Sequence, residues 1–74
     1  MMNNLNTKIS IKVNGETLTI AQNLTVRDLV LQQQLVPERV AIEYNRLILS
    51  RSRWNETILK PEDQLEIVHF VGGG

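Results

Sequence analysis

The stretch that decides the fold is DQLEIVHFVGGG, residues 63–74, where an apolar pattern runs directly into three glycines. Its first part, residues 64–70, predicts a β-strand with Leu65 and Ile67 on one face. We expect residues 71–74 to form a flexible tail that leaves the domain at the end of this strand.

The glycines matter because they remove all side chains from the last three residues of the sequence. Gly72, Gly73 and Gly74 carry no side chain, so nothing bulky stands beside the α-carboxylate of Gly74. Such a carboxylate can enter the active site of another protein and react there. Taken alone, however, terminal glycines are more often a frayed end or a remnant of cloning. The rest of the chain has to decide between these interpretations.

The first part of the chain has the pattern of a β-hairpin. Residues 8–13 alternate between polar and apolar, which is the period of a half-buried strand. Asn14 and Gly15 follow, and this dipeptide tolerates the positive φ angles of a tight type I′ turn. Residues 16–20 then predict the second strand.

A helix is predicted after the hairpin. Thr25 is a typical N-cap, and Asp28 three residues later suits the positive end of a helix. Apolar residues follow at helical spacing: Val26, Leu29 and Val30. We expect the helix to end near Gln34, because Pro37 cannot continue it.

The second half predicts a further series of short elements. These are a strand at residues 40–44, a short strand at 47–49, a loop or helical turn at 51–55, a short edge strand at 56–59 and a turn at 61–63. Together with the hairpin, the helix and the final strand, they predict an α+β fold. We expect a mixed sheet of four to five strands packed on one main helix, with the first and last strands side by side at its centre.

The composition is that of one small soluble domain. The chain has 74 residues, of which 42% are hydrophobic and 22% charged, so it resembles a globular domain more than a disordered segment. Residues 1–7 are polar and predict a disordered lead without a signal sequence, before a domain at 8–70. No apolar run approaches the roughly 20 residues of a membrane span. We therefore expect a cytoplasmic protein that does not bind membranes.

Charge and residue content exclude several kinds of function. Eight basic and eight acidic residues balance, whereas a nucleic-acid-binding protein needs a dominant basic surface. The absence of cysteine excludes disulfides, thiolate zinc sites and thiol nucleophiles. His69 is the one histidine, so a histidine metal cluster is excluded as well. We expect a chain on which enzymes act, with no metal site and no catalytic activity of its own.

The order of elements, the small size and the glycine tail resemble the ubiquitin-like β-grasp family, and most closely the sulfur carriers of thiamine biosynthesis, the ThiS family. The resemblance covers residues 8–74. The segments that carry it are the 63–74 stretch, the hairpin turn at 14–15, the helix start TVRDL at 25–29 and the strand VAIEYN at 40–45. A terminal diglycine alone is a weak signal, but a diglycine that closes this pattern is specific.

The resemblance implies a cycle of sulfur transfer. A ThiF-type adenylating enzyme joins the Gly74 carboxylate to AMP, using ATP and magnesium. Sulfur from cysteine, delivered by a sulfur-transfer protein or cysteine desulfurase, then displaces AMP and leaves a thiocarboxylate. A ThiG-type thiazole synthase takes this sulfur into the thiazole ring. The carrier itself holds no cofactor in this cycle.

The same resemblance gives the residues near the tail their expected roles. Gly72 and Gly73 would be the thread that carries Gly74 into an active site, although Gly72 is the less certain of the two. Phe70 and Val71 are either core residues or partner contacts. An exposed apolar patch on the sheet near the tail is the expected docking surface.

Three alternatives remain open at this stage. The related carrier of molybdopterin synthesis shares the fold and the tail chemistry, but its members usually have a longer first hairpin and often a proline before the diglycine. A ubiquitin-like modifier would use the same carboxylate to join lysines of other proteins. A plain β-grasp interaction domain would have an inert tail.

Overall fold

The computed structural model describes residues 7–70, and these form a five-stranded mixed sheet with one α-helix. The elements in chain order are β1 (Lys8–Val13), β2 (Glu16–Ala21), α1 (Val26–Gln32), the 3₁₀ helix η1 (Pro37–Arg39), β3 (Val40–Tyr44), β4 (Leu47–Leu49), the 3₁₀ helix η2 (Arg51–Glu56) and β5 (Gln64–His69). The predicted α+β fold with a mixed sheet on one main helix is confirmed.

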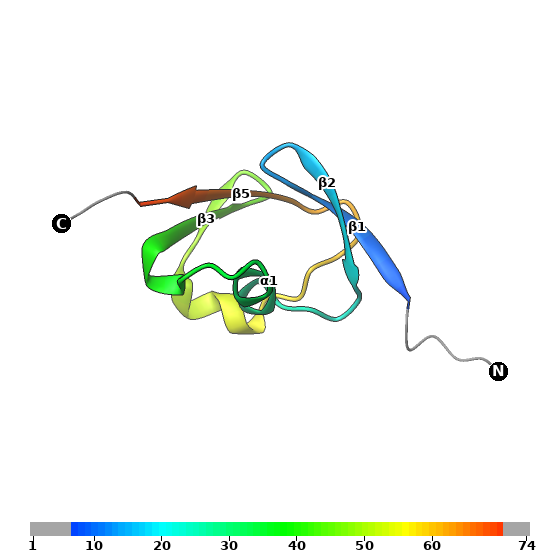
Figure 1. The fold of residues 1–74 in the computed structure, drawn as a ribbon, viewed down its shortest axis with the longest axis horizontal. Helices are drawn as coiled ribbons and strands as arrows, with labels where there is room; N and C mark the ends of the chain where they lie inside the picture. Colours follow the sequence, from blue (N-terminus) through cyan, green and yellow to red (C-terminus); the bar gives the residue numbers. More distant parts are fainter. Residues whose placement is uncertain (1–6, 71–74) are drawn as a thin grey trace.

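The sheet has the strand order β2-β1-β5-β3-β4, so the last strand lies in its middle (Figure 1). β5 pairs in parallel with β1 and antiparallel with β3, as expected for first and last strands that lie side by side. The pairing with β1 covers only Gln64 and Leu65, whereas the pairing with β3 extends from Leu65 to His69. The two ends of β5 are therefore held by different neighbours.

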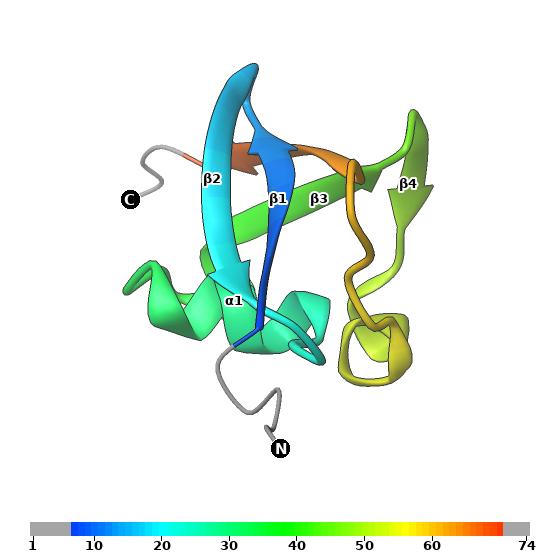
Figure 2. The ribbon, with the colours of Figure 1, turned by 90° about the vertical axis from the view of Figure 1, so that its right-hand side faces the viewer.

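The helix covers one face of the sheet and leaves the other face open (Figure 2). The buried residues between the helix and the sheet form one core: Ile11, Ile20, Val26, Leu29, Val30, Val40, Ile42, Trp54, Leu59 and Leu65. The largest of them is Trp54, whose indole N–H donates to the carbonyl of Leu49 at 3.1 Å. A core of this kind on one face leaves the opposite face available for other contacts.

Local sequence signals explain the hairpin and the helix start. Asn14 and Gly15 have φ angles of 51° and 85°, as a tight hairpin turn requires. At the helix start, the Thr25 hydroxyl accepts the N–H of Asp28 and the Asp28 carboxylate accepts the N–H of Thr25, each at 3.0 Å. This reciprocal pair is a capping box, so the predicted N-cap is correct.

The helix ends before the predicted position and for a different reason. α1 ends at Gln32, and Gln34 takes a left-handed conformation with φ of 62°. The N–H of Leu35 then donates to the carbonyl of Val30 at 3.1 Å, which closes the helix in a Schellman-type arrangement. The turn at Gln34 thus ends the helix at Gln32, five residues before Pro37.

The predicted short strand at residues 56–59 is wrong. In the described part of the chain this segment makes a single bridge, between Ile58 and Thr25. The N–H of Leu59 donates to the carbonyl of Leu24 at 2.8 Å, and Leu59 is buried. The segment therefore packs beside the start of α1, away from the edge of the sheet.

Candidate functional site

The predicted tail residues Val71, Gly72, Gly73 and Gly74 lie outside the described residues, so the structure gives the position from which they continue. That position is Phe70, directly after β5. The N–H of Phe70 donates to the carbonyl of Arg39 at 2.8 Å, and its side chain is 52% exposed. Phe70 is therefore available to a partner at the root of the tail, and His69 beside it is an exposed strand residue.

Beside this root, the open face of the sheet carries exposed apolar side chains. Ile48 on β4 is 76% exposed and Val68 on β5 is 55% exposed. Ala41 is paired with Val68, and together these residues border a shallow hollow of about 390 Å³. We name Ala41, Ile48, Val68 and Phe70 the outer apolar patch. It matches the expected apolar surface near the tail.

The hollow in the outer apolar patch also contains two carboxylates. Glu43 and Glu66 line it and stand directly opposite each other in the β3–β5 register. Like charges in this position weaken a sheet. Neither carboxylate takes part in an ion pair among residues 7–70. The patch is therefore apolar with an acidic centre.

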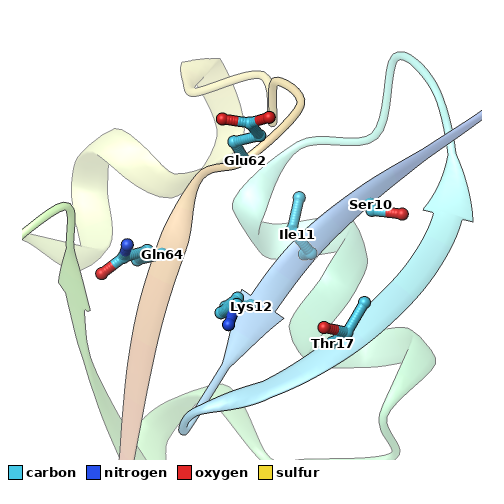
Figure 3. Close-up of a pocket in the computed structure, with 6 residues that line it drawn as sticks. All are labelled: Ser10, Ile11, Lys12, Thr17, Glu62 and Gln64. Atoms are coloured by element: carbon cyan, nitrogen blue, oxygen red, sulfur yellow. The ribbon is translucent and has the colours of Figure 1, made fainter.

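The other half of the open face is polar. A second depression of about 260 Å³ lies over β1, β2 and the turn before β5, and Figure 3 shows its lining. The residues that line it are Ser10, Ile11, Lys12, Thr17, Glu62 and Gln64. These residues present no large exposed apolar side chain, so the apolar surface of the open face is confined to the side near Phe70.

A polar cluster holds the start of β5. Asp63 is 5% exposed, and its carboxylate accepts hydrogen bonds from the Tyr44 hydroxyl at 2.6 Å, the Lys60 backbone N–H at 2.8 Å and the Asn45 amide at 3.2 Å. The Lys60 ammonium donates to the Tyr44 oxygen at 2.9 Å. Every described polar atom of this buried cluster has a partner. The cluster joins the turn before β5 to the end of β3.

The electrostatics of this cluster follow from its hydrogen bonds. Burial raises the pKa of the Asp63 carboxyl, but the bonds from Tyr44, Lys60 and Asn45 outweigh burial and hold that pKa below its usual value. Burial and the adjacent carboxylate raise the pKa of the Tyr44 phenol. These shifts in pKa favour an ionised Asp63 carboxylate beside a neutral Tyr44 phenol. The place of the cluster inside the turn indicates a structural role.

Sequence reasoning missed three of these residues. Glu43 and Glu66 are ordinary strand residues in the sequence, and only the β3–β5 register places them together. Asp63 was expected only to form a turn, because its partner Tyr44 is 19 residues away in the chain. The sequence signal for the outer apolar patch was the alternation of residues 64–70. It places Val68 on the face of the strand that Leu65 and Ile67 do not occupy.

The described residues offer no site for a metal or a membrane span. Within residues 7–70, no group of three or more His, Cys, Asp or Glu side chains is placed to hold a metal ion. None of the helices in this range is both long enough and apolar enough to cross a bilayer.

Comparisons with known proteins agree with this geometry. The sequence model of the ThiS family matches residues 5–74. The sulfur carrier protein ThiS of Bacillus subtilis is 44% identical over 50 residues, which are 68% of this chain and 76% of that protein. A thiazole synthase of Magnetococcus marinus is 36% identical over 66 residues, which cover 89% of this chain but only 20% of that longer protein.

Solved structures agree as well. The crystal structure of the thiamine biosynthesis protein ThiS from Geobacter metallireducens superposes with a TM-score of 0.77 and 32% identity, over 89% of this chain and 100% of that one. The family match at residues 5–74 spans the sequence of all five strands and of the three terminal glycines. The chain therefore belongs to the ThiS family.

Proposed function

We propose that the carboxylate of Gly74 is the group that holds sulfur in this chain. Membership of the ThiS family makes the chain a sulfur carrier in thiamine biosynthesis. The observation that supports Gly74 is the position of the three glycines, which follow the last strand of a β-grasp sheet after two intervening residues. The sequence contains no cysteine, so no side-chain thiol can hold the sulfur.

The proposed reaction begins with activation of the carboxylate. A carboxylate is a poor acceptor of nucleophiles, and adenylation supplies a good leaving group. An oxygen of the Gly74 carboxylate attacks the α-phosphorus of ATP and pyrophosphate leaves. A ThiF-type enzyme would bind the ATP and magnesium and stabilise the charge on the phosphates. The chain contributes the carboxylate and its delivery.

Sulfur then replaces AMP at the same carbon. The persulfide of a sulfur-transfer protein or cysteine desulfurase, whose outer sulfur derives from cysteine, attacks the carbonyl carbon of the adenylate, and AMP leaves. A thiol then reduces the resulting acyl disulfide: the S–S bond breaks, the thiocarboxylate is released, and the thiol forms a disulfide with the donor sulfur. The resulting thiocarboxylate carries the sulfur to its acceptor. Three glycine residues reach at most about 10 Å when extended. This length suits a narrow channel whose mouth lies against the globular part of the carrier.

We further propose that the outer apolar patch docks the ThiF-type enzyme. The patch includes Phe70 at the root of the tail, so a partner seated on it lies beside the residues that enter its active site. Glu43 and Glu66 at its centre favour a partner with a basic group there. They also disfavour a second copy of this chain on the same face.

A ThiG-type thiazole synthase is the proposed acceptor of the sulfur. The similarity to about a fifth of the Magnetococcus thiazole synthase means that a region like this chain occurs within a protein of that name. We take this as support for a partnership between the two activities.

The mass of the chain tests the proposal. We expect incubation with a ThiF-type enzyme, ATP, magnesium and a sulfur source to add about 16 mass units, because one oxygen is replaced by sulfur. Oxidation of a methionine adds a similar mass, so fragmentation must place the change on Gly74. The control omits ATP. An unchanged Gly74 would overturn the proposal.

A complementation test separates the thiamine carrier from the molybdopterin carrier. We expect the chain to rescue a strain that lacks its own thiamine sulfur carrier on medium without thiazole. Rescue of a molybdopterin defect in its place would contradict the assignment. Covalent adducts on lysines of other proteins would instead indicate a protein modifier.

A further inference from the structure

We propose that Asn14 is a positioning residue that fixes the direction of the end of β5, and so the point from which Gly74 is delivered. This inference rests on the proposed function of Gly74. Its basis is a pair of hydrogen bonds between residues that are 53 positions apart in the chain.

The side chain of Asn14 replaces a missing strand neighbour. β1 pairs with Gln64 and Leu65, and the N–H of Asn14 donates to the carbonyl of Leu65 at 2.8 Å. Beyond this point the chain turns back into β2. The Asn14 side-chain oxygen accepts the N–H of Ile67 at 2.7 Å, and its amide donates to the carbonyl of Ile67 at 3.4 Å. The Asn14 side chain thus forms hydrogen bonds with both the N–H and the carbonyl of Ile67, which a longer β1 would have paired.

The turn itself does not require this contact. Asn14 has φ of 51°, a conformation that glycine adopts freely and aspartate tolerates. A glycine at this position would keep the hairpin turn but could not reach Ile67. The choice of asparagine is therefore informative about β5 as well as about the turn.

A second turn asparagine provides an internal comparison. Asn45, in the turn between β3 and β4, has φ of 50°. Its side-chain oxygen accepts the N–H of Gln64 at 2.8 Å, and its amide donates to Asp63 at 3.2 Å. Two asparagines with the same backbone conformation thus hold the two ends of β5, Asn45 at the start and Asn14 near the end.

The contact at Ile67 matters because the rest of the strand is held mainly on one side. After Ile67, the described pairings are with β3, through Val68 and His69, and with Arg39 through the N–H of Phe70. Without the Asn14 amide, residues 67–70 keep only their hydrogen bonds to β3 and Arg39. They can then rotate about the side of β5 that faces β3. A small change of direction at Phe70 displaces the tail that follows, and misplacement of a reacting group by about 1 Å can lower a rate by up to a hundredfold.

Three variants test the proposal in the full chain: Asn14→Gly, Asn14→Asp and Asn45→Gly. Asn14→Gly keeps the turn and removes both bonds to Ile67, and Asn14→Asp retains the acceptor for the Ile67 N–H. Asn45→Gly is the matched control, because it makes the same change at the start of β5. The measurements are hydrogen exchange at the Ile67 amide, the melting temperature, and kcat and KM for adenylation of the carrier by a ThiF-type enzyme.

We expect Asn14→Gly to speed exchange at Ile67 and to lower kcat about fivefold to tenfold. KM should stay within about twofold, since Ala41 on β3 and Ile48 on β4 keep their places in the outer apolar patch. Asn14→Asp should restore most of kcat. Asn45→Gly should lower the melting temperature and leave kcat unchanged. If Asn14 only stabilises the fold, Asn14→Gly should change the melting temperature but should not lower kcat while KM stays the same.

The outcomes distinguish this inference from the proposed function. A wild-type chain that is never adenylated overturns the function of Gly74. A wild-type chain that is adenylated, with Asn14→Gly at the same kcat, overturns only the positioning role. Unchanged exchange at Ile67 in Asn14→Gly would also overturn it, because the bonds would then not hold the strand.

Discussion

The two ends of β5 differ in what surrounds them. At the start, Gln64 and Leu65 lie between β1 and β3, and the carboxylate of Asp63 just before them is buried among three hydrogen-bond donors. At the end, Phe70 is half exposed and continues into the glycine tail. The six residues of β5 therefore connect a buried polar cluster, at Asp63 before the strand, to an exposed apolar surface, at Phe70 after it.

This difference indicates that stability and delivery are separated along β5. The start of the strand holds the sheet together, because it joins β1, β3 and the Asp63 cluster. The exposed residues at the end contribute little to the core, and under the proposed function they present a surface and a tail to other proteins. Changes at the start should therefore affect folding, whereas changes at the end should affect transfer.

The largest effect on stability is expected from Asp63→Ala. Loss of the carboxylate leaves the donors of Tyr44, Asn45 and the Lys60 backbone without their acceptor, which costs roughly 3 kcal/mol of unfolding free energy. This corresponds to a melting temperature lower by roughly 15 °C for a domain of this size. Calorimetry provides the measurement.

Lys60→Ala is the matched control for that variant. The Lys60 ammonium is 3.9 Å from Asp63 and its side chain is largely exposed, so its loss should cost less than about 1 kcal/mol. Equal losses from the two variants would show that burial of the carboxylate is not what stabilises the start of β5.

A smaller effect, on binding, is expected from Ile48→Thr. This change keeps a β-branched side chain but removes apolar surface from the outer apolar patch. We expect KM for adenylation by a ThiF-type enzyme to rise about tenfold, which is about 1.4 kcal/mol, with little change in the melting temperature.

Leu47→Thr is the control for docking. Leu47 is 74% exposed, nearly the same as Ile48 at 76%. It directly precedes Ile48 on β4, so its side chain belongs to the other face of the sheet. Its KM should stay near that of the wild type. If both variants raise KM equally, the partner does not bind the open face.

The smallest expected effect is the loss of the stability contributed by Asp63 when the pH is lowered. The pKa of Asp63 is lower in the folded chain than the value near 3.9 of an unfolded one, so its contribution is complete above about pH 4 and is lost as the pH falls through the folded pKa. Urea unfolding should therefore show a difference between wild type and Asp63→Ala that shrinks below about pH 4. A constant difference down to pH 2 would contradict this assignment.

Local signals in the sequence predicted much of the fold. The turn at Asn14, the cap at Thr25 and the alternation of β1 and β5 each depend on residues close together in the chain, and all three were confirmed. The error at residues 56–59 arose because so short a segment, two polar residues followed by two apolar ones, does not reveal whether its partner is a sheet edge or a helix start.

The candidate site was less accessible to sequence reasoning. The bonds from Asn14 to Ile67 and from Tyr44 to Asp63 join residues far apart in the chain, so no local pattern contains them. The pairing of Glu43 with Glu66 depends on strand register in the same way. The role of Gly74 stays a prediction, which rests on the three terminal glycines together with the family resemblance.

The most direct test of the separation between stability and delivery is removal of Gly74. The chain that lacks Gly74 is compared with a chain that lacks Met1, which is shortened equally at the other end, by calorimetry and by intact mass after incubation with a ThiF-type enzyme, ATP and a sulfur source. We predict that both melt at the wild-type temperature and that only the chain without Gly74 fails to gain the thiocarboxylate. A substantially lower melting temperature without Gly74, or a thiocarboxylate that still forms, would contradict this prediction.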